Sequence, residues 1–527
     1  MMFSLVSGQE AVECINDGDT VAIGGAGAGH AVPDRLMREL GELFARSGGP
    51  QNLRVFHPCG LGDNDSRGMN HLAHEGLVDT AIGGYWGNAP KMVDLALRNK
   101  VKGYNFPQGV LGHLVRATAS GKPGIVTSIG LNTYVDPRLE GGRLNDITTE
   151  DLVELITLDG REYLFYKSIP IDVAFIRGTT ADCEGNLTME EEVGTFSMLS
   201  LAQAAKVNNG IVIAQVKRTA DGHCDPTQVK VPGVFIDYVV VEPDQEMTFL
   251  TGFDPALVKR DVEYEAEELL LEGVKRLVSR RAALELRPGI YVNLGYGMSD
   301  GVPIVAQQEE ITDELVFMIE QGAIAGIPTT GLNFGAMFNP TAIVDDVYQF
   351  DFFHGGGLDM AFLGFAQVDK FGNINSTRFN NFITGSGGAV DISSAAKKIV
   401  FCGTFAVKGE QQITGDGVKI LNPGKAKKFV DQVEQVTFSG KSASERGQSV
   451  FYITERAVFT LVPDGVMLVE IAPGLDLQRD VLDMMEFKPI ISTDLKTIDA
   501  KIYRDQPLGL KHYFTQLKEQ KSGRKGG

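Results

Sequence analysis

Short apolar runs alternate with helical patterns along most of the chain. The runs are apolar on both faces, as in TVAIGG (20–25), IDVAFI (171–176), GIVIAQV (210–216), YVNLG (291–295), ELVFMI (314–319) and KIVFCG (398–403). Between them, segments such as 33–47 and 267–286 carry apolar residues at helical spacing. Strands buried on both faces, with helices between them, are typical of open parallel sheets. The pattern therefore predicts an α/β fold with mostly parallel sheets.

Two local signals mark structure near the ends of the chain. Ser7 and Glu10 have the spacing of a capping box at the start of the first helix. Near the other end, AVFTLVPDGVMLVEIA (457–472) predicts a hairpin whose turn contains Pro463, Asp464 and Gly465.

The two halves of the chain resemble each other. IDVAFIRGTTADCEGNL (171–187) and LDMAFLGFAQVDKFGNI (358–374) align without a gap and share an Asp-x-Ala-Phe segment and an Asp-x-x-Gly-Asn turn. We expect the Gly and the Asn of that turn to supply positive φ angles. A weaker match relates 16–29 to 287–300. The repeat predicts two tandem homologous α/β domains.

A division into two domains also suits a chain of 527 residues, which is too long for one ordinary core. Residues 242–264 show neither a helical nor a strand period and predict a linker. We therefore expect an N-terminal domain over 1–241, a C-terminal domain over 265–517 and a flexible tail over 518–527.

Composition narrows the functional classes. The chain is 43% hydrophobic and 22% charged, which is typical of a soluble globular protein, and no apolar run approaches the ~18 residues of a membrane helix. The net charge of −19 argues against nucleic acid or an anionic membrane as partner. The start lacks signal-peptide features, and the five cysteines have neither disulfide nor metal spacing. We expect a cytoplasmic protein without a metal.

A lone carboxylate stands out in LVFMIEQGAIAGIP (315–328). Glu320 directly follows an apolar run and precedes small residues, and ligands of open α/β sheets bind beyond the carboxyl ends of the strands. A carboxylate there can serve as a nucleophile, a general base or a metal ligand, or it can merely pair with a lysine or cap a helix. Gly322, Ala325 and Gly326 leave room for substrate atoms.

Three further segments could face the same site. Gln108 in YNFPQG (104–109) offers a neutral amide on a turn, and TGSGGAVD (384–391) is a glycine loop before a helical pattern. GGAGAG (24–29), which contains Gly25 and Gly27, follows the strand TVAI. The N–H groups of such loops can hold an anion, although most glycine loops only form tight connections. Neither loop fits the dinucleotide fingerprint, and no P-loop is present.

Taken together, these motifs resemble family I CoA-transferases from about residue 5 to 517, and most of all the branch with propionate and acetate (short-chain acyl) CoA-transferases. The resemblance is carried, in order, by DGDTVAIGG, HLAHEGL, YNFPQG, DITTEDLVEL, EYLFYKSIPIDVAFIRGT, EQGAIAGIP, YQFDFFHGGGLD, FCGTF, YITERAVF and EIAPGLDLQ.

The resemblance implies a role for several residues. It implies that Glu320 is the nucleophile of a ping-pong reaction through a glutamyl-CoA thioester, and that Gln108 belongs to the oxyanion hole. A backbone N–H of Gly387 or Gly388 completes the hole. It also implies coenzyme A as a substrate with no permanently bound cofactor, short-chain acyl-CoA and free carboxylates as reactants, and a homo-oligomer, either a tetramer or a dimer. An ordinary carboxylate pKa of about 4.3 would leave the nucleophile ionised at pH 7 without a partner base.

The chain departs from the family pattern in places that bear on the acyl group. Gln321 stands where family members often have serine or asparagine, and Ala325 where the most similar ones tend to have glycine. Ala26 and His30 replace a phenylalanine and a glycine of the usual signature. An acyl-CoA hydrolase on the same fold, a non-catalytic CoA-ligand-binding protein and, more remotely, a sugar-phosphate isomerase stay open as alternatives. The sequence leaves the preferred acids undetermined.

Overall fold

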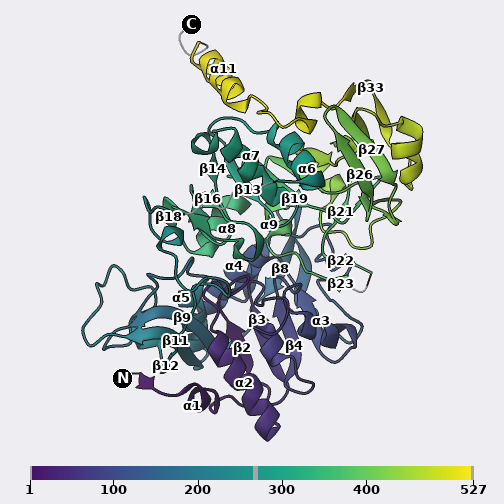
Figure 1. The fold of residues 1–527 in the computed structure, drawn as a ribbon. Coiled ribbons are helices and arrows are strands. Elements are labelled where there is room, and N and C mark those ends of the chain that lie inside the picture. The colour runs from purple at the N-terminus through teal and green to yellow at the C-terminus, as the bar shows by residue number, and fades with distance from the viewer. Residues whose placement is uncertain (1–2, 265–270, 381, 524–527) are drawn as a thin grey trace.

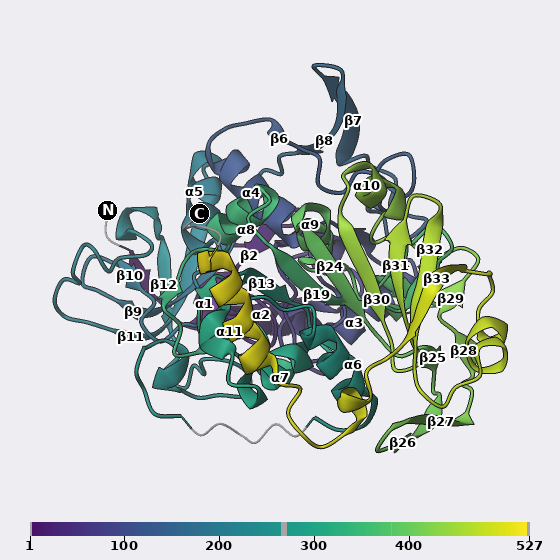
Figure 2. The same cartoon turned by 90° about the horizontal axis from the view of Figure 1, so that it is seen from above.

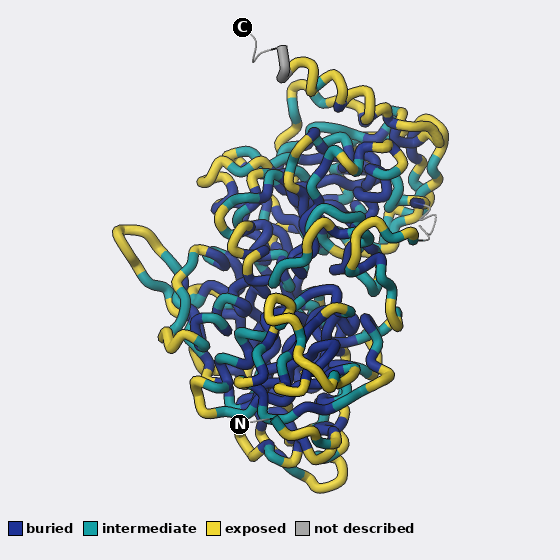
Figure 3. The backbone as a smooth tube through the Cα atoms, turned by 90° about the vertical axis from the view of Figure 1, so that its left-hand side faces the viewer, coloured by how far each residue is buried: buried dark blue, intermediate teal, exposed yellow. Residues whose placement is uncertain are grey.

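The computed structural model describes residues 3–264, 271–380 and 382–523 and divides into two lobes, one for each half of the chain (Figure 1). Each lobe is built on one large sheet, and the sheets use strands from 4–241 and from 291–497 respectively. Buried residues concentrate inside each lobe (Figure 3).

The first sheet is parallel along its whole path. In spatial order its strands are β1 (Ser4–Leu5), β12 (Tyr238–Val241), β11 (Ile211–Thr219), β9 (Val173–Ala181), β2 (Thr20–Ile23), β3 (Leu53–His57), β4 (Val78–Gly83) and β5 (Lys102–Asn105). The short β10 (Leu187–Thr188) pairs antiparallel with β9. The helices of this half are α1 (Gly8–Val12), α2 (Asp34–Ser47), α3 (Pro90–Leu97), α4 (Gln108–Ala119) and α5 (Met198–Val207).

Both faces of the first sheet are buried, which explains why its strands show no polar alternation. Val173 and Phe175 of β9 pack into one hydrophobic cluster with residues of α1, α2 and α3. Their neighbours Ala174 and Ile176 point to the other face and pack with α4 and α5.

A three-stranded antiparallel arm of β6 (Gly124–Thr127), β8 (Arg161–Lys167) and β7 (Val153–Leu158) projects from this half (Figure 2).

The second sheet is mixed at one edge. Its parallel part runs β14 (Val316–Phe317), β13 (Tyr291–Leu294), β19 (Met360–Gly364), β24 (Lys398–Cys402) and β30 (Ser449–Ile453), and it continues through β31 (Ala457–Val462), β32 (Gly465–Ile471) and β33 (Ile490–Thr497). The predicted hairpin is confirmed, since β31 and β32 pair antiparallel across the 463–465 turn. The helices of this half are α6 (Gly273–Ala283), α7 (Val302–Gln308), α8 (Asp346–His354), α9 (Ala389–Ala395), α10 (Gly440–Glu445) and α11 (Leu510–Gly523).

Short strands outside the two large sheets shape the connections of the second half. They are β15 (Ala323–Ile324) with β18 (Ala342–Ile343), β16 (Ile327–Pro328) with β17 (Met337–Phe338), β20 (Gln367–Asp369) with β21 (Ile374–Asn375) and β29 (Phe429–Val430), β22 (Arg378–Phe379) with β23 (Phe382–Ile383), β25 (Ala406–Val407) with β28 (Ala426–Lys427), and β26 (Glu410–Thr414) with β27 (Gly417–Asn422). Among the described helices, none combines the length and apolar content that a membrane-spanning segment requires.

The internal repeat corresponds to equivalent positions in the two sheets. Strand β2 pairs in parallel with β9, as β13 does with β19. In the shared turn, Asp182 Oδ1 accepts the N–H groups of Glu184 and Asn186 at 2.9 Å each, and Asp369 makes the same two bonds in the second half. The α/β class with mostly parallel sheets is confirmed.

Three local expectations need correction or confirmation. In the shared turn only the glycines have positive φ, 82° at Gly185 and 77° at Gly372; the following asparagines bond back to the aspartate instead. Ser7 does form the predicted capping box with Glu10. Within the segment expected to be a tail, α11 continues past position 518 to Gly523, and its first turns are held by buried Leu510 and Phe514; 524–527 lie outside the described residues.

Candidate active site

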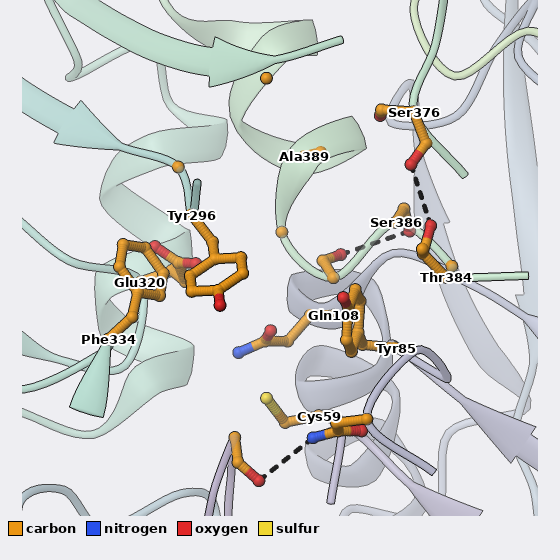
Figure 4. A pocket seen from close by; sticks show the side chains of 18 of the residues that line it. Cys59, Tyr85, Gln108, Tyr296, Glu320, Phe334, Ser376, Thr384, Ser386 and Ala389 are labelled. Atoms are coloured by element: carbon orange, nitrogen blue, oxygen red, sulfur yellow. Dashed lines mark hydrogen bonds between the residues drawn. The ribbon is translucent and has the colours of Figure 1, made fainter. Parts of the chain in front are cut away.

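A cavity of about 430 Å³ lies between the lobes where the carboxyl ends of both sheets meet. From the first lobe it is lined by residues that follow β2, β3, β4 and β5, including Gly27, Cys59, Tyr85, Asn88 and Gln108. From the second lobe it is lined by residues that follow β13, β14 and β19, and by the loop before α9, including Tyr296, Glu320, Gln321, Phe334, Phe365, Gly387 and Gly388. The sequence placed Glu320 at such an edge and offered Gln108 and the 384–391 loop as further candidates, and the structure brings the three together (Figure 4).

Glu320 lies in the connection after β14, which is shorter than the apolar run suggested and ends at Phe317. Its side chain is 7% exposed and accepts a hydrogen bond from Asn293 Nδ2 at 3.1 Å. Asn293 itself is fully buried on β13 and also donates to the Met318 carbonyl at 2.9 Å. A neutral donor on β13, the strand next to the edge strand β14, therefore holds the carboxylate at the cavity wall.

Burial raises the pKa of the Glu320 carboxyl above its usual value. Hydrogen bonds from its own backbone N–H, from Asn293 and from Gln321 lower that pKa, whereas the charge of Asp391 raises it. The net direction is upward, which corrects the expectation of an ordinary carboxylate pKa. Partial removal from water also makes the ionised form a stronger nucleophile.

Gln108 is the first residue of α4 and is 2% exposed. Its side-chain Nε2 has no hydrogen-bond partner anywhere in the described part of the chain. Figure 4 shows this amide pointing into the space that Glu320 and Tyr296 border from the other lobe. A buried donor without an acceptor is costly, and the open cavity beside it is where a ligand oxygen can satisfy it.

The loop before α9 is held against the first lobe by backbone bonds. Gly387 donates its N–H to the Gly84 carbonyl at 2.8 Å, and the Gln108 N–H bonds the Gly387 carbonyl at 2.9 Å. Asn105 fixes the loop further, since its Oδ1 accepts the Ser386 N–H at 3.0 Å. The loop therefore belongs to the second lobe in sequence and is bound to the first in space.

These bonds separate the two glycines that the sequence left undecided. The Gly387 N–H is already used, whereas the Gly388 N–H has no protein acceptor among the described residues. A Cβ placed on Gly388 would lie 3.5 Å from Glu320 Cγ, so its backbone adjoins the carboxylate. Gly388 thus presents a second unpartnered donor beside Glu320.

Of the other expected substrate contacts, only Gly27 lines the cavity. Gly25, Gly322 and Gly326 instead permit close backbone approaches, because a Cβ on each would lie within 2.8 Å of Val32 Cα, 2.1 Å of the Val344 carbonyl and 2.6 Å of the Phe338 carbonyl, respectively. Ala325 has a φ of 53°, in the region that favours glycine. For these four positions the structure offers a conformational reason.

Sequence reasoning missed several residues of the site. Asn293 is the polar exception in the strand YVNLG, and that exception is a signal that could have been noticed. Asn88 donates to the Gly27 carbonyl at 3.2 Å, and Tyr85, Tyr296 and Phe334 add aromatic walls. Nothing in their spacing along the chain indicates that they meet.

The departures from the family signature fall partly inside the cavity. Gln321 lines it, next to Glu320. His30 is fully buried beside Phe196, and burial together with the charge of Arg177 lowers its pKa to about 4, so it is neutral at pH 7. Ala26 pairs with His30 through two backbone hydrogen bonds of 2.8 and 2.9 Å.

Comparison with known proteins supports one family. A coenzyme A transferase family model matches residues 6–242. The chain is 45% identical to the acetate CoA-transferase YdiF of Escherichia coli O157:H7 over 509 residues, which cover 96% of each chain. It is 42% identical to the caffeate CoA-transferase of Acetobacterium woodii over 519 residues, covering 97% of this chain and 99% of the relative.

Two solved structures that are similar to this chain are also CoA-transferases. The crystal structure of the E. coli O157:H7 acyl-CoA transferase YdiF apoenzyme superposes with a TM-score of 0.92 at 44% identity, over 96% of this chain and 97% of that one. A second structure of that enzyme, with a TM-score of 0.91 at 44% identity over the same shares, is described as a thioester complex with CoA. This chain belongs to the coenzyme A transferase family and is a CoA-transferase.

Proposed function

We propose that Glu320 carries coenzyme A as a thioester while the enzyme moves it from a short-chain acyl-CoA to a free carboxylate. One observation supports this most directly: a buried carboxylate faces the unpartnered Gln108 amide across a single cavity. The thioester complex of the similar E. coli enzyme is consistent with it.

The reaction proceeds through two covalent states. A Glu320 carboxylate oxygen attacks the acyl-CoA carbonyl carbon, the carbon–sulfur bond breaks, and a mixed anhydride and CoA thiolate form. The thiolate then attacks the Glu320 side-chain carbonyl carbon, which releases the first acid and leaves a glutamyl-CoA thioester. The second carboxylate reverses both steps. Dividing the exchange in this way replaces one difficult attack with several easier ones.

Each attack generates a tetrahedral oxyanion that needs donors. We assign Gln108 Nε2 and the Gly388 N–H to this role, because both are unpartnered within the described residues and both border Glu320 or the space it faces. Both donors are neutral, so they stabilise a developing charge without forming an ion pair with the resting carboxylate. A single donor of this kind typically contributes about 10²–10³ in rate.

The size of the cavity supports a short acyl group. A space of about 430 Å³ must hold the end of the CoA thiol arm as well as the acyl chain. Acetyl, propionyl and butyryl groups are therefore the proposed donors. Acetate transfer is the named activity of one relative and caffeate transfer that of another, so a panel of acids is needed to rank acceptors.

A covalent trapping experiment tests the nucleophile. Wild-type enzyme treated with acetyl-CoA and then borohydride is expected to lose activity, with the Glu320 side chain reduced to an alcohol in peptide mass spectra. Enzyme treated with borohydride alone, and the Glu320→Gln variant treated with both, are expected to show no reduction. Reduction at another residue, or undiminished transfer by Glu320→Gln, would refute the assignment.

The product formed with each acceptor acid distinguishes CoA transfer from hydrolysis. Acetyl-CoA consumption is measured with propionate, butyrate, lactate and acetoacetate, following new CoA esters and free thiol separately. Transfer predicts new esters with little free thiol. Equal thiol release with and without acceptors would indicate a hydrolase. Two further proposals have separate tests. Light scattering of the purified enzyme tests whether it is a homo-oligomer, dimeric or tetrameric. Fractionation of cells that contain the enzyme tests a cytoplasmic location.

A further inference from the structure

The first turn of α4 is capped by the other lobe. Its N-cap position is Pro107, which makes no side-chain capping bond. Asp391 of α9 takes that place, accepting the Gly109 N–H through Oδ2 and the Val110 N–H through Oδ1, each at 3.2 Å. A carboxylate at a helix N-terminus satisfies free N–H groups and interacts favourably with the helix dipole.

Asp391 is itself held in one orientation. It is fully buried, and His354 at the end of α8 contacts its Oδ1 through Nε2 at 2.9 Å. His354 is partly buried, with its ring 5.0 Å from that of His113 on α4. Since the carboxylate is removed from solvent, its bonding depends on these protein groups alone.

The contact between Asp391 and the first turn of α4 leaves no room for a side chain at Gly109. A Cβ on Gly109 would lie 2.8 Å from Asp391 Oδ1 and 2.4 Å from Phe350 Cδ1. The absence of a side chain at Gly109 therefore lets the carboxylate and the α8 ring close on the helix end. That helix end begins with Gln108, directly before the two capped N–H groups.

Asp391 also lies close to the second donor. It belongs to the first turn of α9, three residues after Gly388. One side chain thus connects the helix that carries the Gln108 amide to the helix that follows the Gly388 N–H. We propose that Asp391, oriented by His354, is a positioning residue that sets the distance between the two oxyanion donors.

This inference rests on the proposed role of Gln108, and Asp391→Asn tests it. Asparagine keeps the size but replaces one acceptor oxygen with an NH₂ group, so one helix N–H loses its partner. The expected result is a kcat lower by about 10- to 100-fold with KM for acetyl-CoA changed less than about threefold, because the loss falls on the transition state.

A double-mutant cycle separates positioning from general damage. In the Gln108→Ala background there is no amide left to position, so Asp391→Asn is expected to lower kcat by less than about threefold further. If the kcat losses of Asp391→Asn and Gln108→Ala multiply in full in the double variant, the inference is overturned. An unchanged kcat in the Asp391→Asn single variant would overturn it as well.

Two further variants keep the test decisive. If Asp391→Asn does not fold, His354→Phe replaces it, with an expected kcat loss of about 3- to 10-fold that disappears in the Gln108→Ala background; full multiplication there would equally refute the proposal. Asp351→Asn is the control, since Asp351 contacts Arg116 and His113 across the same helix pair at 3.2 and 2.9 Å but is largely exposed. It is expected to leave kcat within about twofold.

Failure of this inference can be distinguished from failure of the proposed function. If Gln108→Ala transfers CoA as fast as wild type, the oxyanion assignment is wrong and the positioning role falls with it. If Gln108→Ala is slow but Asp391→Asn is as fast as wild type, only the positioning role is wrong. Melting temperatures and CoA binding of each variant confirm that folded enzyme is compared.

Discussion

Asn293 Nδ2 lies 3.1 Å from Glu320 Oε2 and holds the carboxylate from β13, the strand between β14 and β19 in the second sheet. This bond lowers the pKa of Glu320 against the larger, opposite effect of burial. The carboxylate is therefore both partly desolvated and oriented, and no Lys, Arg or His of the described residues forms an ion pair with it.

Replacing Asn293 is expected to move the acidic limb of the pH–rate profile. Asn293→Ala removes a bond that favours the ionised form, and Asn293→Asp adds a second carboxyl beside the first, so the pKa of Glu320 rises in both and more in the aspartate variant. In the proposed mechanism the carboxylate must be ionised to attack, so the fall in kcat/KM with decreasing pH is expected to set in at a higher pH than in wild type. Coincident profiles for the three enzymes would contradict the arrangement.

The raised pKa of Glu320 also predicts a stability difference. A group whose pKa is higher in the folded than in the unfolded protein stabilises the fold below its unfolded pKa, and this contribution is lost as pH rises through the folded pKa. At pH 7, Glu320→Gln should therefore melt at or above the temperature of wild type, because it carries no buried charge. The difference should shrink as the pH approaches 4. A lower melting temperature at pH 7 would argue against a costly buried carboxylate.

Gln108→Ala is expected to lower kcat by about 10²–10³, as loss of one oxyanion donor does. Binding of acyl-CoA should change much less, since the amide acts on charge that develops only in the transition state. Gln435→Ala is a suitable control, because Gln435 is also buried and also bonds across the lobes, to Glu140 at 2.7 Å, but does not line the cavity. Steady-state kinetics of both variants check the prediction, and equal losses in the two would contradict it.

Gly109→Ala tests how closely the lobes fit. Alanine favours a helix over glycine by about 1 kcal/mol, yet its Cβ would lie 2.4 Å from Phe350, and overpacking costs about 1–3 kcal/mol. We expect a net loss of stability together with slower transfer, measured by thermal melting and kinetics. Gly222→Ala, with open space around its Cβ and no positive φ, is the matched control and should change neither.

The parts of the fold that were predictable rest on local and periodic signals. Apolar runs gave the strands, and the duplicated Asp-x-x-Gly-Asn turn gave the relation between the halves, because both depend on neighbours in sequence. The boundary of α11 was less predictable, since Leu510 and Phe514 anchor it through contacts with the second lobe. Short strands such as β14 also end earlier than their apolar runs.

The candidate site was predictable where a residue is unusual in its own segment. Glu320 follows an apolar run, and Gln108 sits at a proline turn. Asp391 looked like one more polar residue after a glycine loop, because its importance lies in bonds to residues more than 280 positions earlier in the chain. Gly25 and Gly322 looked like substrate contacts, yet backbone crowding explains them, and spacing cannot distinguish the two causes.

The assembly of the cavity from both lobes bears on how such an enzyme can arise by duplication. Two related lobes give a single catalytic centre rather than two, because in the proposed mechanism the first lobe supplies the Gln108 amide and the second supplies Glu320 and the Gly388 N–H. Gene fission between β12 and β13 would accordingly yield two polypeptides that are each inert, and turnover would return only when they pair.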